Sequence, residues 1–185
     1  MTTRLPLITD AQAGPPEVVA AIRQRRGGQL LELDRLLLHS PAVAAGWGEL
    51  MGRVRTQLDL PPLLRELAMC AVAALTGAEY ELYHHAPLYL QAGASEAQLA
   101  ALRRLGQCTS GSIESDVLSD PIFDATSQAA LAVVIEMTQQ VRVSDATFAR
   151  ARTVLGSDQR MFELVAVTAS YNMVARILVA MNLKP

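Results

Sequence analysis

Apolar side chains recur every three or four positions along most of the chain, a spacing that places them on one face of an α-helix. Helix start and stop signals separate these stretches, with proline in the first turn of several and glycine after the last residue of others. The alternation of apolar and polar residues that is typical of strands is absent from the sequence. The pattern therefore predicts an all-α bundle of about eight helices with no sheet.

Capping signals mark three of the predicted helices. Proline residues start a helix over 62–75, Gly77 interrupts the apolar run, and a second helix resumes over 78–91. The pair Asp120-Pro121 is typical of a helix start and predicts a helix over 122–140. The first two helices are joined by a very short turn, so we expect them to pack side by side.

A polar stretch divides the sequence. Residues 106–119 are rich in Gly and Ser and predict a loop. We expect one domain over 1–185, or two halves, 1–105 and 120–185, that this loop joins.

Composition narrows the class of protein and its partners. Hydrophobic residues make up 51% of the chain, charged residues 18% and aromatic residues 4%, which predicts a core of Ala, Val, Leu and Met that a subunit interface extends. A formal net charge of −2 offers no excess of cations for phosphate, so no nucleic-acid partner is expected. The sequence has neither a leader pattern nor an uninterrupted apolar run of the roughly 18 residues that a membrane span needs. A cytoplasmic protein with no membrane partner is predicted.

The two cysteines do not form a metal or redox motif. Cys70 and Cys108 have no second Cys or His at ligand spacing, so the sequence predicts neither a metal site nor a CxxC couple. Both are expected to be small core residues.

The densest group of polar residues lies in the predicted helix 78–91. Glu81 and His85 are four residues apart and therefore share a face of that helix. A carboxylate there can fix which nitrogen of the imidazole carries the proton, and histidine titrates close to neutral pH. Such a pair is suited to general acid–base chemistry.

Glu66 is embedded in the apolar helix 62–75. A buried carboxylate needs a partner, and the side-by-side packing of the two helices makes His85 a natural one. The alternative is that Glu66 is an exposed residue near the start of its helix, where the helix dipole favours a negative charge. For His85 the alternative is a hydrogen-bonded histidine of the core.

The order of these residues carries a resemblance. The pattern is Arg65-Glu66-Leu67, then Ala78-x-Tyr80-Glu81-x3-His85-x7-Gly93. It resembles the core motif of the carboxymuconolactone decarboxylase and alkylhydroperoxidase D (AhpD)-like superfamily. His39-Ser40-Pro41 and the C-terminal segments around Glu163 and Tyr171 are also similar to that superfamily, so the resemblance covers about 4–183. It implies an AhpD-like helical fold and assembly into a homo-oligomer, as a dimer, trimer or hexamer.

The peroxidase branch of that superfamily uses a CxxC pair that this chain lacks. Counted from Glu66, the two cysteine positions fall on Ala78 and Glu81, whereas the proton-relay positions fall on Glu66 and His85. Peroxide reduction by that branch needs two thiols, so we do not expect it here. Cys70 cannot replace them, since it lies in the preceding helix without a second cysteine.

The decarboxylase branch is the better match and implies roles for the site residues. His85 would be the acid–base catalyst, with Glu66 and Glu81 orienting it. Tyr80, Ala78 and Tyr171 are the candidate residues of the substrate pocket, and neither cofactor nor metal is expected. The alternatives are that Tyr80 is a buried tyrosine hydrogen-bonded to the backbone and that Tyr171 belongs to a polar spot in an interface. The substrate would be a small carboxylated molecule, for which Arg65, Arg152 and Arg176 are the candidate anion-binding arginines. The alternative is a non-catalytic ligand-binding or structural oligomer that keeps the scaffold.

Overall fold

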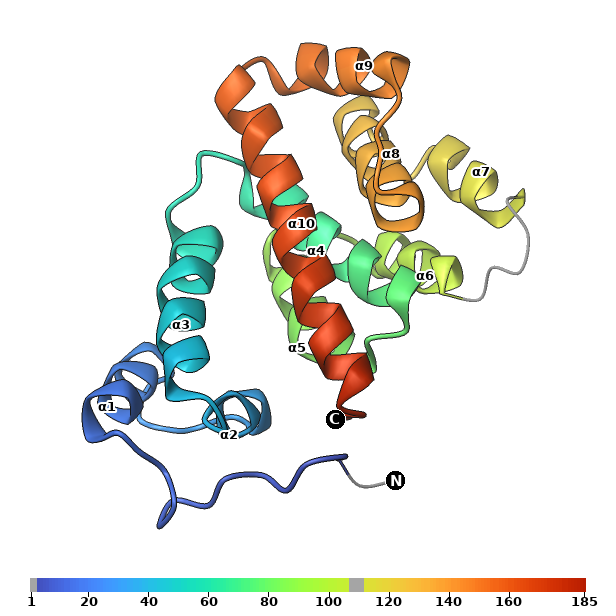
Figure 1. Cartoon of the computed structure of the whole chain (residues 1–185). Coiled ribbons are helices and arrows are strands. Elements are labelled where there is room, and N and C mark those ends of the chain that lie inside the picture. Colours follow the sequence, from blue (N-terminus) through green and yellow to red (C-terminus); the bar gives the residue numbers. More distant parts are fainter. Residues whose placement is uncertain (1–2, 107–111) are drawn as a thin grey trace. The chain divides into compact units, whose positions relative to one another are not determined.

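The computed structural model describes residues 3–106 and 112–185, with side chains for all of these except 112–115. In these ranges the chain forms ten helices and no strand, so the predicted all-α class is confirmed (Figure 1). The helices are α1 (Pro16–Arg25), α2 (Glu32–Leu37), α3 (Pro41–Thr56), α4 (Pro62–Thr76), α5 (Glu79–Gln91), α6 (Glu96–Leu105), α7 (Ser112–Ser119), α8 (Ala125–Gln140), α9 (Asp145–Leu155) and α10 (Asp158–Ala180).

The predicted loop over 106–119 is wrong for much of its length. Residues 112–119 form α7, which packs against α6 and α8, and residues 107–111 lie outside the described part of the chain. Val117 of α7 is fully buried. Burial of Val117 and packing against two helices thus stabilise a helix in a segment whose composition favours a loop.

The start of the following helix is also corrected. α8 begins at Ala125 rather than at 122, and its cap is Asp124, whose carboxylate accepts a hydrogen bond of 2.7 Å from the backbone N–H of Ser127. Asp120, the predicted cap, instead accepts from the N–H of Ile122 within the turn before the helix. Both aspartates precede an apolar stretch, and the buried Phe123 lies in the turn between them, immediately before the cap that the helix uses.

The chain forms two compact units. One comprises the residues up to 57 together with 180–184, and the other comprises 58–179 with Pro185. In the first unit α1 and α2 pack on α3, and the fully buried carboxylate of Asp34 is held by Arg25 and Arg26. The single domain over 1–185, or its two halves, stays a prediction.

The second unit is built around α4. This helix packs against α5, α6 and α8, and ten of its residues are buried, so it is a core helix apolar on nearly every side. α4 ends at Gly77, whose φ of 69° lies in the left-handed region that glycine adopts without strain. The turn at Gly77 brings α5 back along α4, and this hairpin positions the candidate site.

α10 is long and apolar enough to cross a membrane by length and composition, but half of its apolar window is buried inside the protein. Its inward residues, such as Leu164 and Val167, belong to the core. A core helix of this kind meets the same criterion as a membrane span, so its apolar character is not specific to a membrane.

Candidate functional site

Glu66 of α4 and His85 of α5 are hydrogen-bonded to each other. The distance between Glu66 Oε2 and His85 Nδ1 is 2.7 Å, and the two residues are 6% and 7% exposed. The alternative in which Glu66 is an exposed residue is therefore excluded. The short turn at Gly77 explains the contact, because it forces the two helices to lie side by side.

A third residue completes a chain of hydrogen bonds. Tyr171 Oη of α10 lies 3.0 Å from His85 Nε2, its ring stands edge-on to the imidazole at 85°, and the tyrosine is 0% exposed. We call Glu66, His85 and Tyr171 the relay. A carboxylate can only accept, so Nδ1 of a neutral His85 carries the proton and Nε2 accepts from the phenol. One imidazole is thus held at both nitrogens by side chains from two other helices.

Glu81 lies in the same interior. It is one helical turn before His85 and 2% exposed. Its charge acts on Cys70: burial raises the pKa of the Cys70 thiol, and the carboxylates of Glu66 and Glu81 raise it further. Two acidic groups therefore surround this part of the core, and a thiolate at Cys70 is strongly disfavoured.

Two of the residues predicted to line the substrate pocket, Ala78 and Tyr80, are also buried. Ala78 is the N-cap residue of α5, and the ring of Tyr80 packs against that of His84, with 4.4 Å between centroids. His84 is only half-buried, whereas His85 points inward. Roles for Ala78, Tyr80 and Tyr171 in substrate binding stay predictions, as do the catalytic roles of Glu66, Glu81 and His85.

Sequence reasoning did not find the contact between Tyr171 and His85, which are 86 residues apart. The available signal was the polar pair Tyr171-Asn172 within an apolar helix. Asn172 donates hydrogen bonds to Thr138 of α8 and to the backbone of Thr168, which fixes this turn of α10.

The three candidate arginines differ in their partners. Arg152 is exposed and forms an ion pair with Asp158. Arg176 donates hydrogen bonds to the backbone and side-chain oxygens of Asn172. The Nε of Arg65 lies 3.9 Å from Glu66 Oε1, so only this arginine of the three adjoins the relay.

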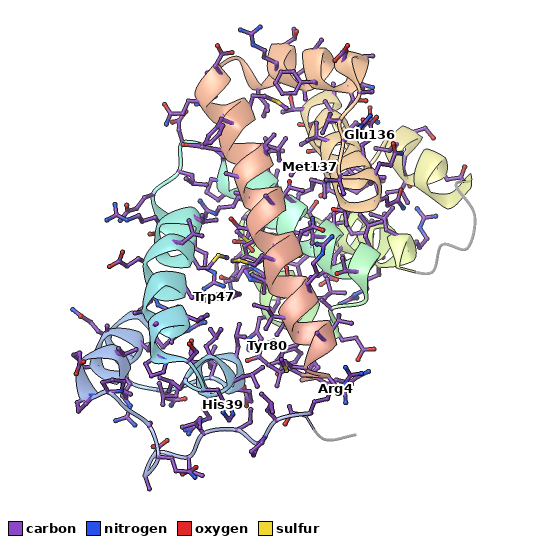
Figure 2. The ribbon with its side chains drawn as sticks, in the orientation of Figure 1. Arg4, His39, Trp47, Tyr80, Glu136 and Met137 are labelled. Atoms are coloured by element: carbon purple, nitrogen blue, oxygen red, sulfur yellow. The ribbon has the colours of Figure 1, made fainter. Side chains whose placement is uncertain are left out.

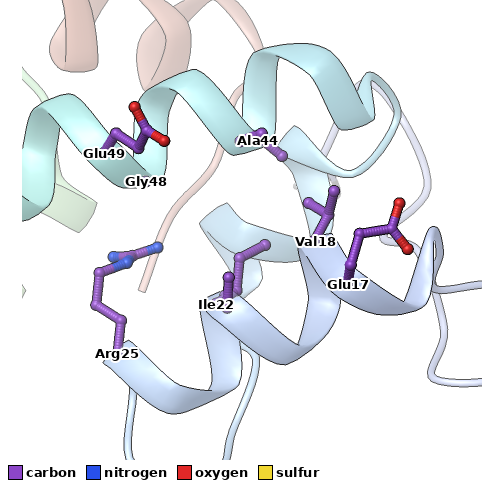
Figure 3. A pocket seen from close by; sticks show the side chains of 9 residues that line it. Glu17, Val18, Ile22, Arg25, Ala44, Gly48 and Glu49 are labelled. Atoms are coloured by element: carbon purple, nitrogen blue, oxygen red, sulfur yellow. The ribbon is translucent and has the colours of Figure 1, made fainter.

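Two grooves lie outside the relay. One, of about 360 Å³, lies between α1 and α3, with Glu17 and Arg25 at opposite ends and Ile22 between them (Figure 3). The other lies between α5 and α6 and includes Leu82 and Arg103. Relay residues line neither groove.

Among the described residues, no group of three His, Cys, Asp or Glu side chains could hold a metal ion. Cys108 lies outside the described part of the chain. Independence of metal and cofactor therefore stays a prediction.

Comparison with known proteins gives one family match for part of the chain and several similar folds for nearly all of it. Residues 41–118 match the model of the Carboxymuconolactone decarboxylase family. The fold is similar to that of the AhpD core of an uncharacterised peroxidase-related protein from Ralstonia eutropha JMP134, with a TM-score of 0.77, 15% identity, and coverage of 99% of this chain and 92% of that one. A second peroxidase-related protein, from Silicibacter sp. TM1040, has a TM-score of 0.70 at 16% identity, with coverage of 100% and 94%.

A third similar structure has a ligand. It is a cysteine-to-alanine variant of the debrominase Bmp8 in complex with 2,3,4-tribromopyrrole, with a TM-score of 0.74, 16% identity, and coverage of 98% of this chain and 91% of that one. No curated protein matches the sequence significantly. The comparisons thus relate residues 41–118 to the carboxymuconolactone decarboxylase family model and show an AhpD-like fold, and the sequence has no CxxC pair.

Proposed function

We propose that this chain is a thiol-independent proton-transfer enzyme, a lyase of the decarboxylase type that acts on a small carboxylated substrate without metal or cofactor. The observation that carries the proposal is the 2.7 Å hydrogen bond between Glu66 and His85 in a buried setting. A carboxylate that accepts from Nδ1 stabilises the imidazolium that forms when Nε2 takes up a proton.

In the proposed reaction, the bond between a substrate carbon and its carboxyl group breaks and CO2 leaves. The electron pair remains on the carbon as an enolate-type anion, which must then receive a proton. His85 supplies that proton from its imidazolium form, in which Nε2 also carries a proton: the phenol of Tyr171 donates its own proton to the substrate carbon and takes that of Nε2. Neutral His85, with its proton on Nδ1 and held by Glu66, is left behind. Solvent returns the proton to the relay after product release.

The substrate class is part of the proposal. Carboxymuconolactone decarboxylase is the name of the matching family, and the similar Bmp8 structure contains a small halogenated ring. Both favour a small cyclic or unsaturated molecule. We further propose that the enzyme is a cytoplasmic homo-oligomer with no nucleic-acid or membrane partner, in keeping with its high apolar and low charged content.

The test is turnover. Wild type and His85→Gln are incubated with a panel of carboxylated lactones and β-keto acids, and CO2 release is measured. We expect release from at least one compound by the wild type and none above background by the variant, with both proteins folded by circular dichroism. Equal release by the two proteins would refute the assignment.

A non-catalytic oligomer is the second candidate, and one observation favours it. Tyr171 already occupies the outer nitrogen of His85, and every side chain of the relay is buried, as in a structural hydrogen-bond network. Under this alternative, no compound of the panel is turned over, and substitutions in the relay lower stability alone.

Peroxidase chemistry is disfavoured. Alanine and glutamate occupy the positions of the two thiols, and burial together with two carboxylates raises the pKa of the Cys70 thiol. We expect no thiol-dependent consumption of hydroperoxide by the protein.

A further inference from the structure

Arg65 has an unsatisfied donor beside the relay. Its Nε is buried and, within the described part of the chain, has no hydrogen-bond acceptor. The ion pair with Glu66 Oε1, at 3.9 Å, is too long to be a hydrogen bond. The side chain as a whole is 14% exposed, so solvent or a ligand can reach part of it.

A buried charged donor without an acceptor is costly, and a ligand oxygen is the natural remedy. The guanidinium is a planar fork that matches the two oxygens of a carboxylate, and such bidentate pairs are strong as well as directional. Arg65 is therefore suited to bind a carboxylate rather than a neutral group.

Arg65 lies next to the residues that are proposed to transfer the proton. Glu66 uses one oxygen for His85 and turns the other towards Arg65. The carboxylates of Glu66 and Glu81 would repel an anion, and the guanidinium supplies the opposite charge where it is needed. Arg152 and Arg176, the other candidates, each already donate to two oxygens, those of Asp158 and of Asn172 respectively.

We propose that Arg65 anchors the carboxylate of the ligand next to Glu66 and His85. This assignment rests on the proposed function for its ligand class, a small carboxylate. Arg65 is then the residue that determines specificity for the anion, whereas the relay moves the proton.

The test uses benzoate as the probe and benzamide, its neutral analogue, as the ligand control. Binding is measured by titration calorimetry and through the NMR signals of the arginine Nε–H groups, on wild type, Arg65→Met and Arg65→Lys. Methionine keeps much of the apolar stem, and lysine keeps the charge without the fork. Arg150→Met, at an exposed arginine of α9, is the matched control.

We expect benzoate to bind wild type and Arg150→Met alike, to shift the Arg65 Nε–H signal, and to bind Arg65→Met at least tenfold more weakly, with Arg65→Lys between. Benzamide should bind all four proteins weakly. Undiminished binding of benzoate to Arg65→Met, or no preference of the wild type for benzoate over benzamide, would overturn the assignment.

The Arg65 proposal and the proposed function can fail independently, because one is tested by benzoate binding and the other by turnover. If Arg65→Met keeps benzoate while His85→Gln loses turnover, only the anchor is wrong. If Arg65→Met loses benzoate but no compound of the panel is turned over by wild type, the anchor stands and the lyase assignment falls.

Discussion

Two buried glutamates in apolar helices of this protein have different partners. Glu163 of α10 is 8% exposed and accepts hydrogen bonds from the backbone N–H of Leu60, at 2.7 Å, and from the amide of Gln159, at 3.0 Å. Glu66 of α4 is 6% exposed and binds the imidazole of His85. Each glutamate precedes a leucine in its sequence.

The two glutamates differ in the groups that donate hydrogen bonds to them. A backbone N–H and a side-chain amide do not titrate near neutral pH and cannot act as a general acid or base, so Glu163 only fixes the segment before α4 to α10. An imidazole does titrate there, so the pair that contains Glu66 can move a proton. A buried carboxylate is therefore structural or chemical according to its partner, which local sequence does not specify.

The largest expected effect is on turnover. Glu66→Gln should lower kcat by about 100-fold to 10,000-fold, since general acid–base catalysis contributes that much and the glutamine cannot stabilise an imidazolium as a charge does. Glu163→Gln, the matched buried glutamate, should leave kcat unchanged. The rates are measured on any substrate that the panel of acids provides. Equal losses in the two variants would remove the distinction between the glutamates.

The second expected effect is on the free energy of unfolding, which substitution of Glu163 should lower more than substitution of Glu66. Glu163→Leu leaves the Leu60 N–H buried without an acceptor, which should lower the free energy of unfolding by about 2 to 3 kcal/mol. Glu66→Gln keeps a hydrogen-bonding side chain and should cost less. Urea unfolding followed by circular dichroism measures both. A larger loss for Glu66→Gln would indicate that the relay is mainly structural.

Removal of the Tyr171 hydroxyl tests whether this tyrosine takes part in proton transfer. Tyr171→Phe keeps the ring and deletes the bond to Nε2, so the free energy of unfolding should fall by only about 1 kcal/mol. Turnover should fall as well if the phenol carries the proton from the imidazole to the substrate, as in the proposed reaction. Tyr89→Phe is the control, since Tyr89 is another fully buried tyrosine and its hydroxyl has no hydrogen-bond partner among the described residues. A Tyr171→Phe enzyme with wild-type kcat would exclude the phenol from the proton path.

The smallest effect concerns a third carboxylate, Glu136 of α8, labelled in Figure 2. Burial alone would raise its pKa, but hydrogen bonds from Thr147 and from the backbone and side chain of Ser144 outweigh burial and lower the pKa below the ordinary 4.5. A lowered folded-state pKa means stability that is present above pH 4.5 and is lost as the pH falls through the folded-state value.

Glu136→Gln should therefore flatten the acid side of the stability profile while leaving turnover unchanged. Thermal unfolding of both proteins across the acid range measures this. A profile identical to that of the wild type would show that these hydrogen bonds do not contribute.

The sequence predicts those parts of the molecule that depend on local signals. The hairpin of α4 and α5 follows from the glycine between two apolar helices, and with it comes the pairing of residues 19 positions apart, Glu66 and His85. By contrast, the polar pair Tyr171-Asn172 indicates a polar site within an apolar helix, but the contact of Tyr171 with His85 depends on how α10 packs, which local sequence does not specify.

The wrong predictions, the loop at 106–119 and the start of α8, also concern features that depend on tertiary contacts. Burial of Val117 makes a helix of a segment whose polar composition favours a loop, and two aspartates with equal capping potential precede α8. The sequence also contains three equivalent candidate arginines, and only the structure distinguishes Arg65 by its missing acceptor. Tertiary contacts decide each of these cases, and periodicity and capping rules do not include them.

The central claim is that Glu66 and His85 share a proton that belongs to Nδ1. Long-range 1H–15N spectra of the labelled protein near neutral pH test it directly, with the signals of His85 assigned by their absence from His85→Gln. We predict that the neutral ring carries its proton on Nδ1, with a low-field resonance that is lost or moves upfield in Glu66→Gln. A ring protonated only on Nε2, or a spectrum that Glu66→Gln leaves unchanged, would contradict the account.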